Sequence, residues 1–284
     1  MRIGAHTSSS PSLENAALHA HEVGGNTLQI FTGSPRTWAA SPPKPDQVVK
    51  FLAARERLDL QPLVIHDNYL INMASLDDAI RSKSIAAYRG EVERAITLDA
   101  DYLVAHPGSY KDQTVETAIA ILTRSMIAAV KGLKSKKLTL LLENTAGQGS
   151  ALGSRFEELV EIRRRVASKV DFEIGYCIDT AHAFAAGLRN LSKEIESGLG
   201  VDRVPVFHVN DSKTPFGSRV DRHEHIGQGY IGEEAFRRIL THPKLRDKAF
   251  ILETPVDQEG DDARNIATLK RLCRKRPTTR TRSS

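Results

Sequence analysis

Short apolar runs rich in β-branched residues alternate along the chain with longer amphipathic stretches. The short runs predict eight strands, at residues 2–5, 27–31, 63–65, 102–105, 138–142, 172–178, 204–209 and 249–252. The stretches that follow them predict helices at residues 13–21, 46–57, 82–98, 115–133, 155–166, 181–187, 233–240 and 261–274. A strand followed by a helix, eight times over, predicts an α/β protein with a closed (β/α)8 TIM barrel.

The length and composition agree with one large domain. A single barrel commonly uses about 200 to 250 residues, and no composition break in the 284 residues marks a linker. With 40% hydrophobic and 26% charged residues, the chain is unlike disordered or collagen-like proteins. We expect the barrel to occupy residues 1–272, with a basic, disordered tail at 273–284.

The N-terminus and the cysteine count predict a cytoplasmic protein. The first residues have no long apolar stretch and no cleavage site, and no apolar run is long enough to span a membrane. Two cysteines are too few for a disulfide framework or a cysteine-based zinc site. Any metal would therefore be held by histidines and carboxylates.

The positive charge of the chain is largely a property of its C-terminus. The net charge is +5, but the last fifteen residues contain seven lysines and arginines and no acidic residue. Residues 1–269, with 33 basic and 35 acidic residues, carry −2. Such a tail could add non-specific affinity for phosphate, or could simply be a solvated end.

Six of the predicted strands, the third to the eighth in order, end in an imidazole or a carboxylate. These residues are His66, His106, Glu143, Asp179, His208 and Glu253. The carboxyl ends of barrel strands open onto one face, where barrel enzymes place their chemistry. A single histidine there is usually structural, but burying several carboxylates together is costly without cations. The pattern therefore predicts a metal cluster.

Two local motifs extend the candidate set to nine. His182 follows Asp179 by three residues, so the pair could share one face of a turn, and Asp221 and His223 are two residues apart. At three or four ligands per ion, nine residues suit two or three ions, with one carboxylate bridging. Mixed nitrogen and oxygen ligands fit zinc, with manganese or iron as alternatives. Clustered divalent ions suit displacement at phosphorus, so phosphodiester hydrolysis is the leading reaction class.

Several of these residues lie in longer motifs. In chain order the motifs are IHDNYLIN at 65–72, HPGS at 106–109, LENTAGQG at 142–149, DTAHAF at 179–184, HVNDSK at 208–213, DRHEHIG at 221–227 and LETP at 252–255. This series resembles the endonuclease IV family of abasic-site repair nucleases. The resemblance runs from residue 3 to about residue 272. Only the basic tail falls outside it.

The resemblance implies a barrel with three zinc ions. One ion would be held by His66, His106 and Glu143, and Glu143 would bridge to a second ion with Asp179, His208 and Glu253. The third would be held by His182, Asp221 and His223. A hydroxide bridging the metals would cut the bond 5′ to an abasic site in duplex DNA, leaving a 3′-hydroxyl and a 5′-deoxyribose phosphate. Family members also trim blocked 3′ ends, and they suggest a monomer.

The resemblance also suggests how damaged DNA is recognised. The stretch FTGSPRTW at 31–38 looks like the family's inserting loop, with Arg36 at the inserting position, and Tyr69 matches its second inserting residue. A planar cation and an aromatic ring can fill the space of a displaced nucleotide and offset lost stacking. Read without the family, Arg36 is a surface arginine and Tyr69 lies at the edge of the core.

Two other functions are compatible with this barrel. A metal-dependent sugar isomerase or epimerase would need one or two ions and a general base, and the third ligand set and the Arg36 loop argue against it. A non-catalytic nucleic-acid-binding descendant would lack ligands, and none of the nine is missing. The run 227–232 has the GxGxxG spacing of dinucleotide sites, but it follows no clear strand, so we interpret it as a loop at the mouth.

Overall fold

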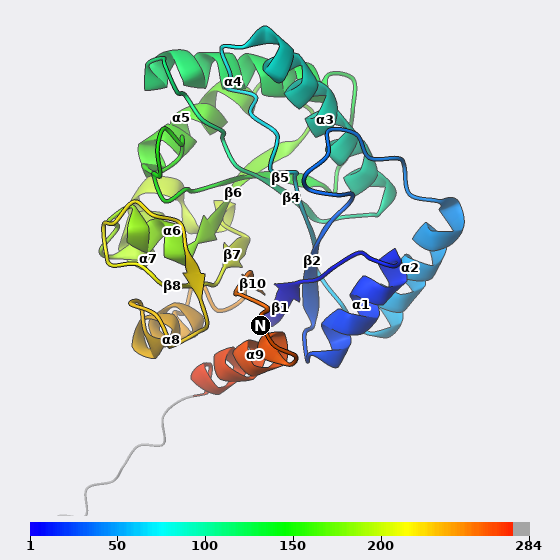
Figure 1. Ribbon diagram of the computed structural model, residues 1–284, viewed down its shortest axis with the longest axis vertical. Coiled ribbons are helices and arrows are strands. Elements are labelled where there is room, and N and C mark those ends of the chain that lie inside the picture. The colour runs from blue at the N-terminus through cyan, green and yellow to red at the C-terminus, as the bar shows by residue number, and fades with distance from the viewer. Residues whose placement is uncertain (275–284) are drawn as a thin grey trace, which may run out of the picture.

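Eight parallel strands close into a barrel in the computed structural model of the chain, which describes residues 1–274 (Figure 1). Around the barrel the order is β1, β10, β7, β6, β5, β4, β3, β2. The strands are β1 (Arg2–His6), β2 (Thr27–Phe31), β3 (Leu63–His66), β4 (Tyr102–Ala105), β5 (Thr139–Glu143), β6 (Glu173–Asp179), β7 (Val206–His208) and β10 (Ala249–Leu252). The predicted TIM barrel is confirmed, and residues 275–284 of the expected tail lie outside the described residues.

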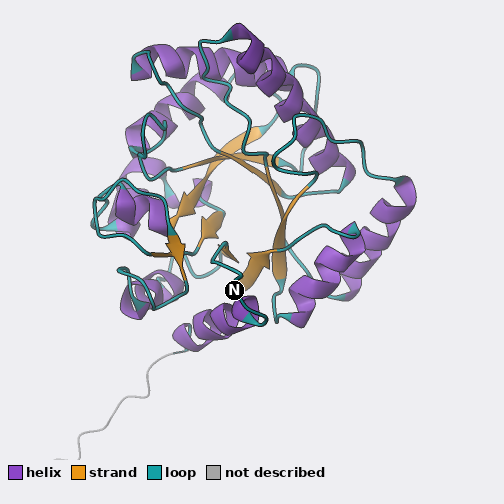
Figure 2. Cartoon of the chain, in the orientation of Figure 1, coloured by secondary structure: helices purple, strands orange, loops and turns teal. Residues whose placement is uncertain are grey.

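Helices form an outer layer around the strands (Figure 2). They are α1 (Leu13–Glu22), α2 (Pro45–Arg57), α3 (Asp78–Thr97), α4 (Val115–Val130), α5 (Phe156–Val166), α6 (Thr180–Ala185), α7 (Leu191–Glu194), α8 (Glu233–Thr241) and α9 (Asp261–Leu272). The third helix begins four residues before its predicted start because Asp77 caps it, accepting hydrogen bonds from the N–H groups of Ala79 and Ile80. Within residues 1–274, no helix has both the length and the apolar character needed to cross a membrane.

Two connections are more elaborate than the sequence pattern predicts. Between β6 and β7, the single expected helix is replaced by α6, α7, a π-helical turn (Ile195–Leu199) and a 3-10 turn (Val201–Arg203). After β7, β8 (Asp211–Ser212) pairs antiparallel with β9 (His223–Glu224), and β8 packs against α6 (Figure 1). Strands of two residues are too short to show the alternation by which a strand is recognised.

The barrel has a core of its own, separate from the layer between strands and helices. Its buried side chains are Val64, Val104, Leu141, Cys177, Val206, Ala249 and Ile251. Successive side chains of a strand point to opposite faces, so the residue two positions after each of these core residues also points into the barrel. Where that residue is polar and lies at the end of the strand, its side chain points into the mouth of the barrel.

The GxGxxG run is folded around a buried carboxylate of the protein itself. Asp211 is fully buried, and its two oxygens accept hydrogen bonds from the N–H groups of Ser212, Gly227, Ile231 and Gly232 at 2.8 to 3.3 Å. A Cβ atom on Gly229 would lie 2.5 Å from Oδ1 of Asp211, so this close approach requires glycine. The run is thus a loop held by Asp211, as predicted, and the strand before it, β9, is only two residues long.

Replacing Asp211 with alanine should lower the free energy of unfolding by at least about 3 kcal/mol, since it removes the acceptor of several buried N–H groups that cost about 1 to 3 kcal/mol each when unpaired. Urea denaturation of the metal-free protein measures the change. Asp211→Asn keeps one acceptor oxygen and should lose less. A change within about 0.5 kcal/mol for the alanine variant would contradict this role for Asp211.

Candidate metal centre

Six of the nine predicted ligands stand two positions after a side chain of the barrel interior. They are His66, His106, Glu143, Asp179, His208 and Glu253, which follow Val64, Val104, Leu141, Cys177, Val206 and Ile251. Strand alternation turns all six toward the inside of the barrel, and the parallel strands bring them to the same end. The structure thus gathers the strand-end residues at one mouth, as the sequence predicts.

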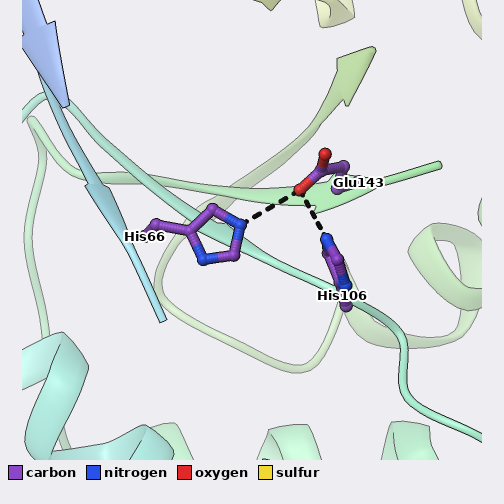
Figure 3. A group of neighbouring side chains, drawn as sticks. All are labelled: His66, His106 and Glu143. Carbon is purple, nitrogen blue, oxygen red and sulfur yellow. Dashed lines mark hydrogen bonds and ion pairs between the residues drawn. The ribbon is translucent and has the colours of Figure 1, made fainter. Parts of the chain in front are cut away.

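Glu143 lies at the centre of this cluster and is fully buried. Its Oε2 atom is 2.9 Å from Nε2 of His106 and 3.2 Å from Nε2 of His66 (Figure 3). Its other oxygen, Oε1, is 2.8 Å from Nδ1 of His208. The two oxygens of one carboxylate therefore face two different groups of imidazoles, which is the arrangement that a bridging ligand needs.

The donor atoms fall into three groups, each spanning no more than 4.8 Å. The groups are His66, His106 and Glu143; Glu143, Asp179, His208 and Glu253; and Asp179, His182 and His223. The first two correspond to the sets implied by the family resemblance. The third group contains Asp179, which the resemblance assigns to the second ion alone. Asp179 therefore belongs to both the second and the third group.

Asp221, which the resemblance assigns to the third ion, lies beside the third group and is not a member of it. Its Oδ2 atom is 3.1 Å from Nε2 of His182, and its Oδ1 atom is 3.4 Å from Nε2 of His223. All nine predicted residues are therefore brought together at the mouth. His182 comes from α6, His223 from β9 and Asp221 from the loop before β9, so these segments supply the part of the cluster that the barrel strands do not.

His223 shows that the cluster suits a cation. In the described chain, its Nε2 atom is buried and has no hydrogen-bond partner, although carboxylate oxygens of Asp221 and Asp179 lie 3.4 and 3.5 Å away. Two ligands about 2.0 to 2.1 Å from a tetrahedral zinc ion are separated by about 3.3 Å. These spacings are long for hydrogen bonds but right for atoms that share a metal ion.

Backbone carbonyls orient three of the imidazoles toward the cluster. The Nδ1 atoms of His66, His182 and His223 lie 2.8, 2.9 and 3.0 Å from the carbonyl oxygens of Asp67, Asn144 and Glu253. A carbonyl only accepts, so each Nδ1 must carry the hydrogen. Each Nε2 atom then has a free lone pair directed at the cluster, as metal-ligating histidines require.

The cluster demands positive charge at its centre. Burial opposes protonation of His66, but its hydrogen bond with Glu143 and the neighbouring carboxylates raise its pKa to about 9. Burial likewise opposes ionisation of Glu143, but the charges of His208 and His106 hold its pKa well below the usual range. Against the opposing effect of burial, the neighbouring carboxylates also raise the pKa values of His182 and His208, so without ions these imidazoles hold protons more strongly. A divalent ion would replace these protons, so metal binding should release them.

The two predicted DNA-contacting residues lie on neighbouring loops. Tyr69 is 65% exposed and lines the same cleft, of about 270 Å³, as His66, His106 and His223. Arg36 is exposed on the loop after β2, and the backbone N–H of Tyr69 donates to the carbonyl of Pro35 at 3.1 Å, which joins the two loops. The structure therefore places Tyr69 beside the cluster and joins its loop to the loop that carries Arg36.

Arg94, a buried arginine on α3, forms hydrogen bonds with both ends of the loop at residues 32–40, which carries Arg36. Arg94 donates from Nε to Oγ1 of Thr32 at 2.7 Å and from Nη1 to the carbonyl of Ala40 at 3.3 Å. Glu91 completes this network, pairing with Arg94 at 2.9 Å and accepting from Thr32 at 2.5 Å. The loop is thus held on the barrel through side chains that hydrophobic periodicity does not reveal.

Two buried amides that contact the cluster were missed by the sequence reasoning. Asn210 donates to Oδ2 of Asp179 at 2.7 Å and accepts from the N–H of Glu253 at 2.8 Å. Gln29, on β2, contacts His208 and Glu253. In the sequence, these residues stand out only as polar side chains within or next to a buried apolar run. That pattern does not indicate which residues they contact.

Comparisons with known proteins show the family to which the chain is similar. Residues 18–275 match the family described as "Xylose isomerase-like TIM barrel". The chain is 56% identical over 280 residues to "Probable endonuclease 4" of Solibacter usitatus, covering 96% of this chain and 97% of the relative. The crystal structure of endonuclease IV from Thermus thermophilus superposes with a TM-score of 0.84 at 35% identity, covering 96% of this chain and 98% of the other. A D-tagatose 3-epimerase-like protein, with a TM-score of 0.72 and 20% identity over 96% of this chain and 97% of the other, shares the fold.

Proposed function

The chain belongs to the endonuclease IV family, and from this premise we propose that it repairs DNA by hydrolysing the phosphodiester bond 5′ to an abasic site in a duplex. The products would be a 3′-hydroxyl and a 5′-deoxyribose phosphate, and the same centre would trim blocked 3′ ends. The observation that carries the proposal is the convergence of three donor groups on one cleft beside Tyr69.

The donor set fits three zinc ions, with manganese or iron as alternatives at some positions. His66, His106 and Glu143 would hold the first; Glu143, Asp179, His208 and Glu253 the second; His182, Asp221 and His223 the third. Bound divalent ions lower the pKa of water and neutralise charge on a phosphate. Glu143 would couple two of the ions, and no side chain would become covalently attached to the substrate.

The protein's own residues would choose the substrate. The carboxylates of the cluster would repel a phosphate unless cations neutralise them, so DNA binding at the cleft would depend on the loaded centre. Arg36 and Tyr69 would occupy the space left by a displaced nucleotide, where the guanidinium and the ring replace lost stacking. The hydrogen bond from the N–H of Tyr69 to the carbonyl of Pro35 would hold the two loops in a fixed position relative to each other.

The sugar isomerase alternative receives less support. The epimerase-like structure is similar in fold alone, at 20% identity. An isomerase needs one or two ions, whereas His182, His223 and their carboxylate neighbours form a third donor group here. Relatives with high identity over almost their whole length carry the endonuclease name.

Incision of an end-labelled duplex with one central abasic analogue that lacks the aldehyde tests the proposal, because the analogue prevents β-elimination. We expect one cut, 5′ to the lesion, with a 3′-hydroxyl on the upstream fragment and no cut in undamaged duplex. Protein that carries its metals and leaves the analogue intact would contradict the proposal. A screen of keto-sugars would then test the isomerase alternative.

A further inference from the structure

Gln29 connects three residues of the mouth that are far apart in the sequence. Its side chain is fully buried on β2. Nε2 of Gln29 lies 2.6 Å from Oε1 of Glu253 and 2.9 Å from Nδ1 of His6, and Oε1 of Gln29 lies 2.8 Å from Nε2 of His208. The amide therefore joins β1, β2 and β7 with the residue that follows β10.

The chemistry of the partners fixes the orientation of this amide. An ionised carboxylate can only accept, so the amide nitrogen of Gln29 must face Glu253. The amide oxygen must then face His208, whose Nε2 atom has to donate the hydrogen. In the neutral imidazole that binds a metal ion, the lone pair is then on Nδ1 of His208, the atom that lies 2.8 Å from Oε1 of Glu143 and 3.2 Å from Oε2 of Glu253.

His208 differs in this respect from three other imidazoles of the cluster. His66, His182 and His223 direct Nδ1 at a backbone carbonyl and present Nε2 to the cluster. His208 presents Nδ1 instead, and the acceptor that makes this tautomer favourable is the side chain of Gln29. A backbone carbonyl is present whatever the side chain of its residue. The acceptor for His208, in contrast, exists only because residue 29 is a glutamine.

We propose that Gln29 is a positioning residue for one ion of the centre, the ion that His208 and Glu253 would share with Glu143 and Asp179. It sets the tautomer of His208 and holds one oxygen of Glu253, so that Nδ1 of His208 and Oε2 of Glu253 converge. The inference rests on the proposed function because it presupposes the metal centre. It adds a residue outside the nine predicted ligands.

Zinc binding by Gln29→Met tests the inference. Methionine keeps the length of the side chain but makes neither hydrogen bond. We expect two zinc ions to bind as in the unsubstituted protein and one to bind about 10- to 100-fold more weakly, as found when partners of metal ligands are removed. Competition with a chromogenic chelator gives the number and affinity of the ions, and a thermal melt of the metal-free protein monitors the fold.

Gln113→Met is the matched control. Gln113 also donates its amide to a protein oxygen, the carbonyl of Ala74 at 2.7 Å, but it contacts none of the nine predicted ligands. It should keep all three ions at unsubstituted affinity. If Gln29→Met does not fold, Gln29→Glu replaces it. That variant keeps the acceptor for His208 and, when its side chain is ionised, cannot donate to Glu253, so it should weaken the same ion.

Two outcomes would overturn the proposed role of Gln29, and a third would overturn the proposed function. A folded Gln29→Met that binds three zinc ions with unsubstituted affinity would overturn the inference alone. Equal weakening of all three ions would also overturn it, because a general effect on the fold acts on the whole cluster. Unsubstituted protein that binds three ions but does not incise the abasic duplex would overturn the proposed function, and the zinc titrations would still decide the role of Gln29.

Discussion

Replacing Glu143 with alanine should reduce incision about 10³-fold or more and should weaken two ions at once. The carboxylate faces His66 and His106 with one oxygen and His208 with the other, so its loss removes a ligand from two donor groups. Metal ions contribute several kcal/mol to phosphoryl chemistry, and each 1.4 kcal/mol corresponds to about a factor of ten in rate. The measurement is the zinc content of the purified variant together with its incision rate.

Glu158→Ala is the control for this substitution. Glu158 is a partly buried glutamate that accepts a hydrogen bond from the N–H of Gly153 at 2.7 Å and belongs to none of the donor groups. It should keep its zinc and its activity within a few-fold. Full zinc occupancy in Glu143→Ala would refute the bridging role, whatever the loss of activity.

The double variant Arg36→Ala with Tyr69→Ala should bind abasic duplex about 10- to 100-fold more weakly while keeping its zinc. Each stacking side chain contributes about 1 to 3 kcal/mol by alanine substitution, and neither residue belongs to a donor group. Arg36 also contributes a charge that attracts any DNA, so affinity alone would not identify recognition of damage. The informative quantity is the ratio of affinities for abasic and undamaged duplex, which should fall.

Arg164→Ala on α5 controls for the lost charge. Arg164 is largely exposed and pairs with Glu161 at 2.7 Å. Its removal should leave the ratio of affinities unchanged. An unchanged ratio in the Arg36 and Tyr69 double variant would show that neither residue reads the lesion.

The strand-end residues could be predicted because they combine two signals that are local in the sequence. A β-branched run marks the strand, and a polar residue at its end, such as His66 after residues 63–65, marks the mouth. Parallel strands then place these ends together without any knowledge of packing. The start of α3 at Asp78 was missed because capping by Asp77 acts before the periodic pattern begins.

The residues that orient the ligands could not be predicted in this way. Gln29 lies 179 positions from His208 and 224 from Glu253, and only closure of the barrel brings them into contact. The place of Asp179 between two donor groups has a similar cause. Asp179 ends β6 and also caps α6 through the N–H of His182, and β9 brings His223 to it from a distant part of the chain.

The most direct test of the account is a zinc titration of metal-free protein, followed by incision of the duplex with the abasic analogue at each step. We expect incision to be absent without metal, to appear as the donor groups fill, and to reach its maximum at three ions per chain. Full incision by protein that holds no divalent metal would contradict the account, as would a protein that binds three ions and leaves the analogue uncut.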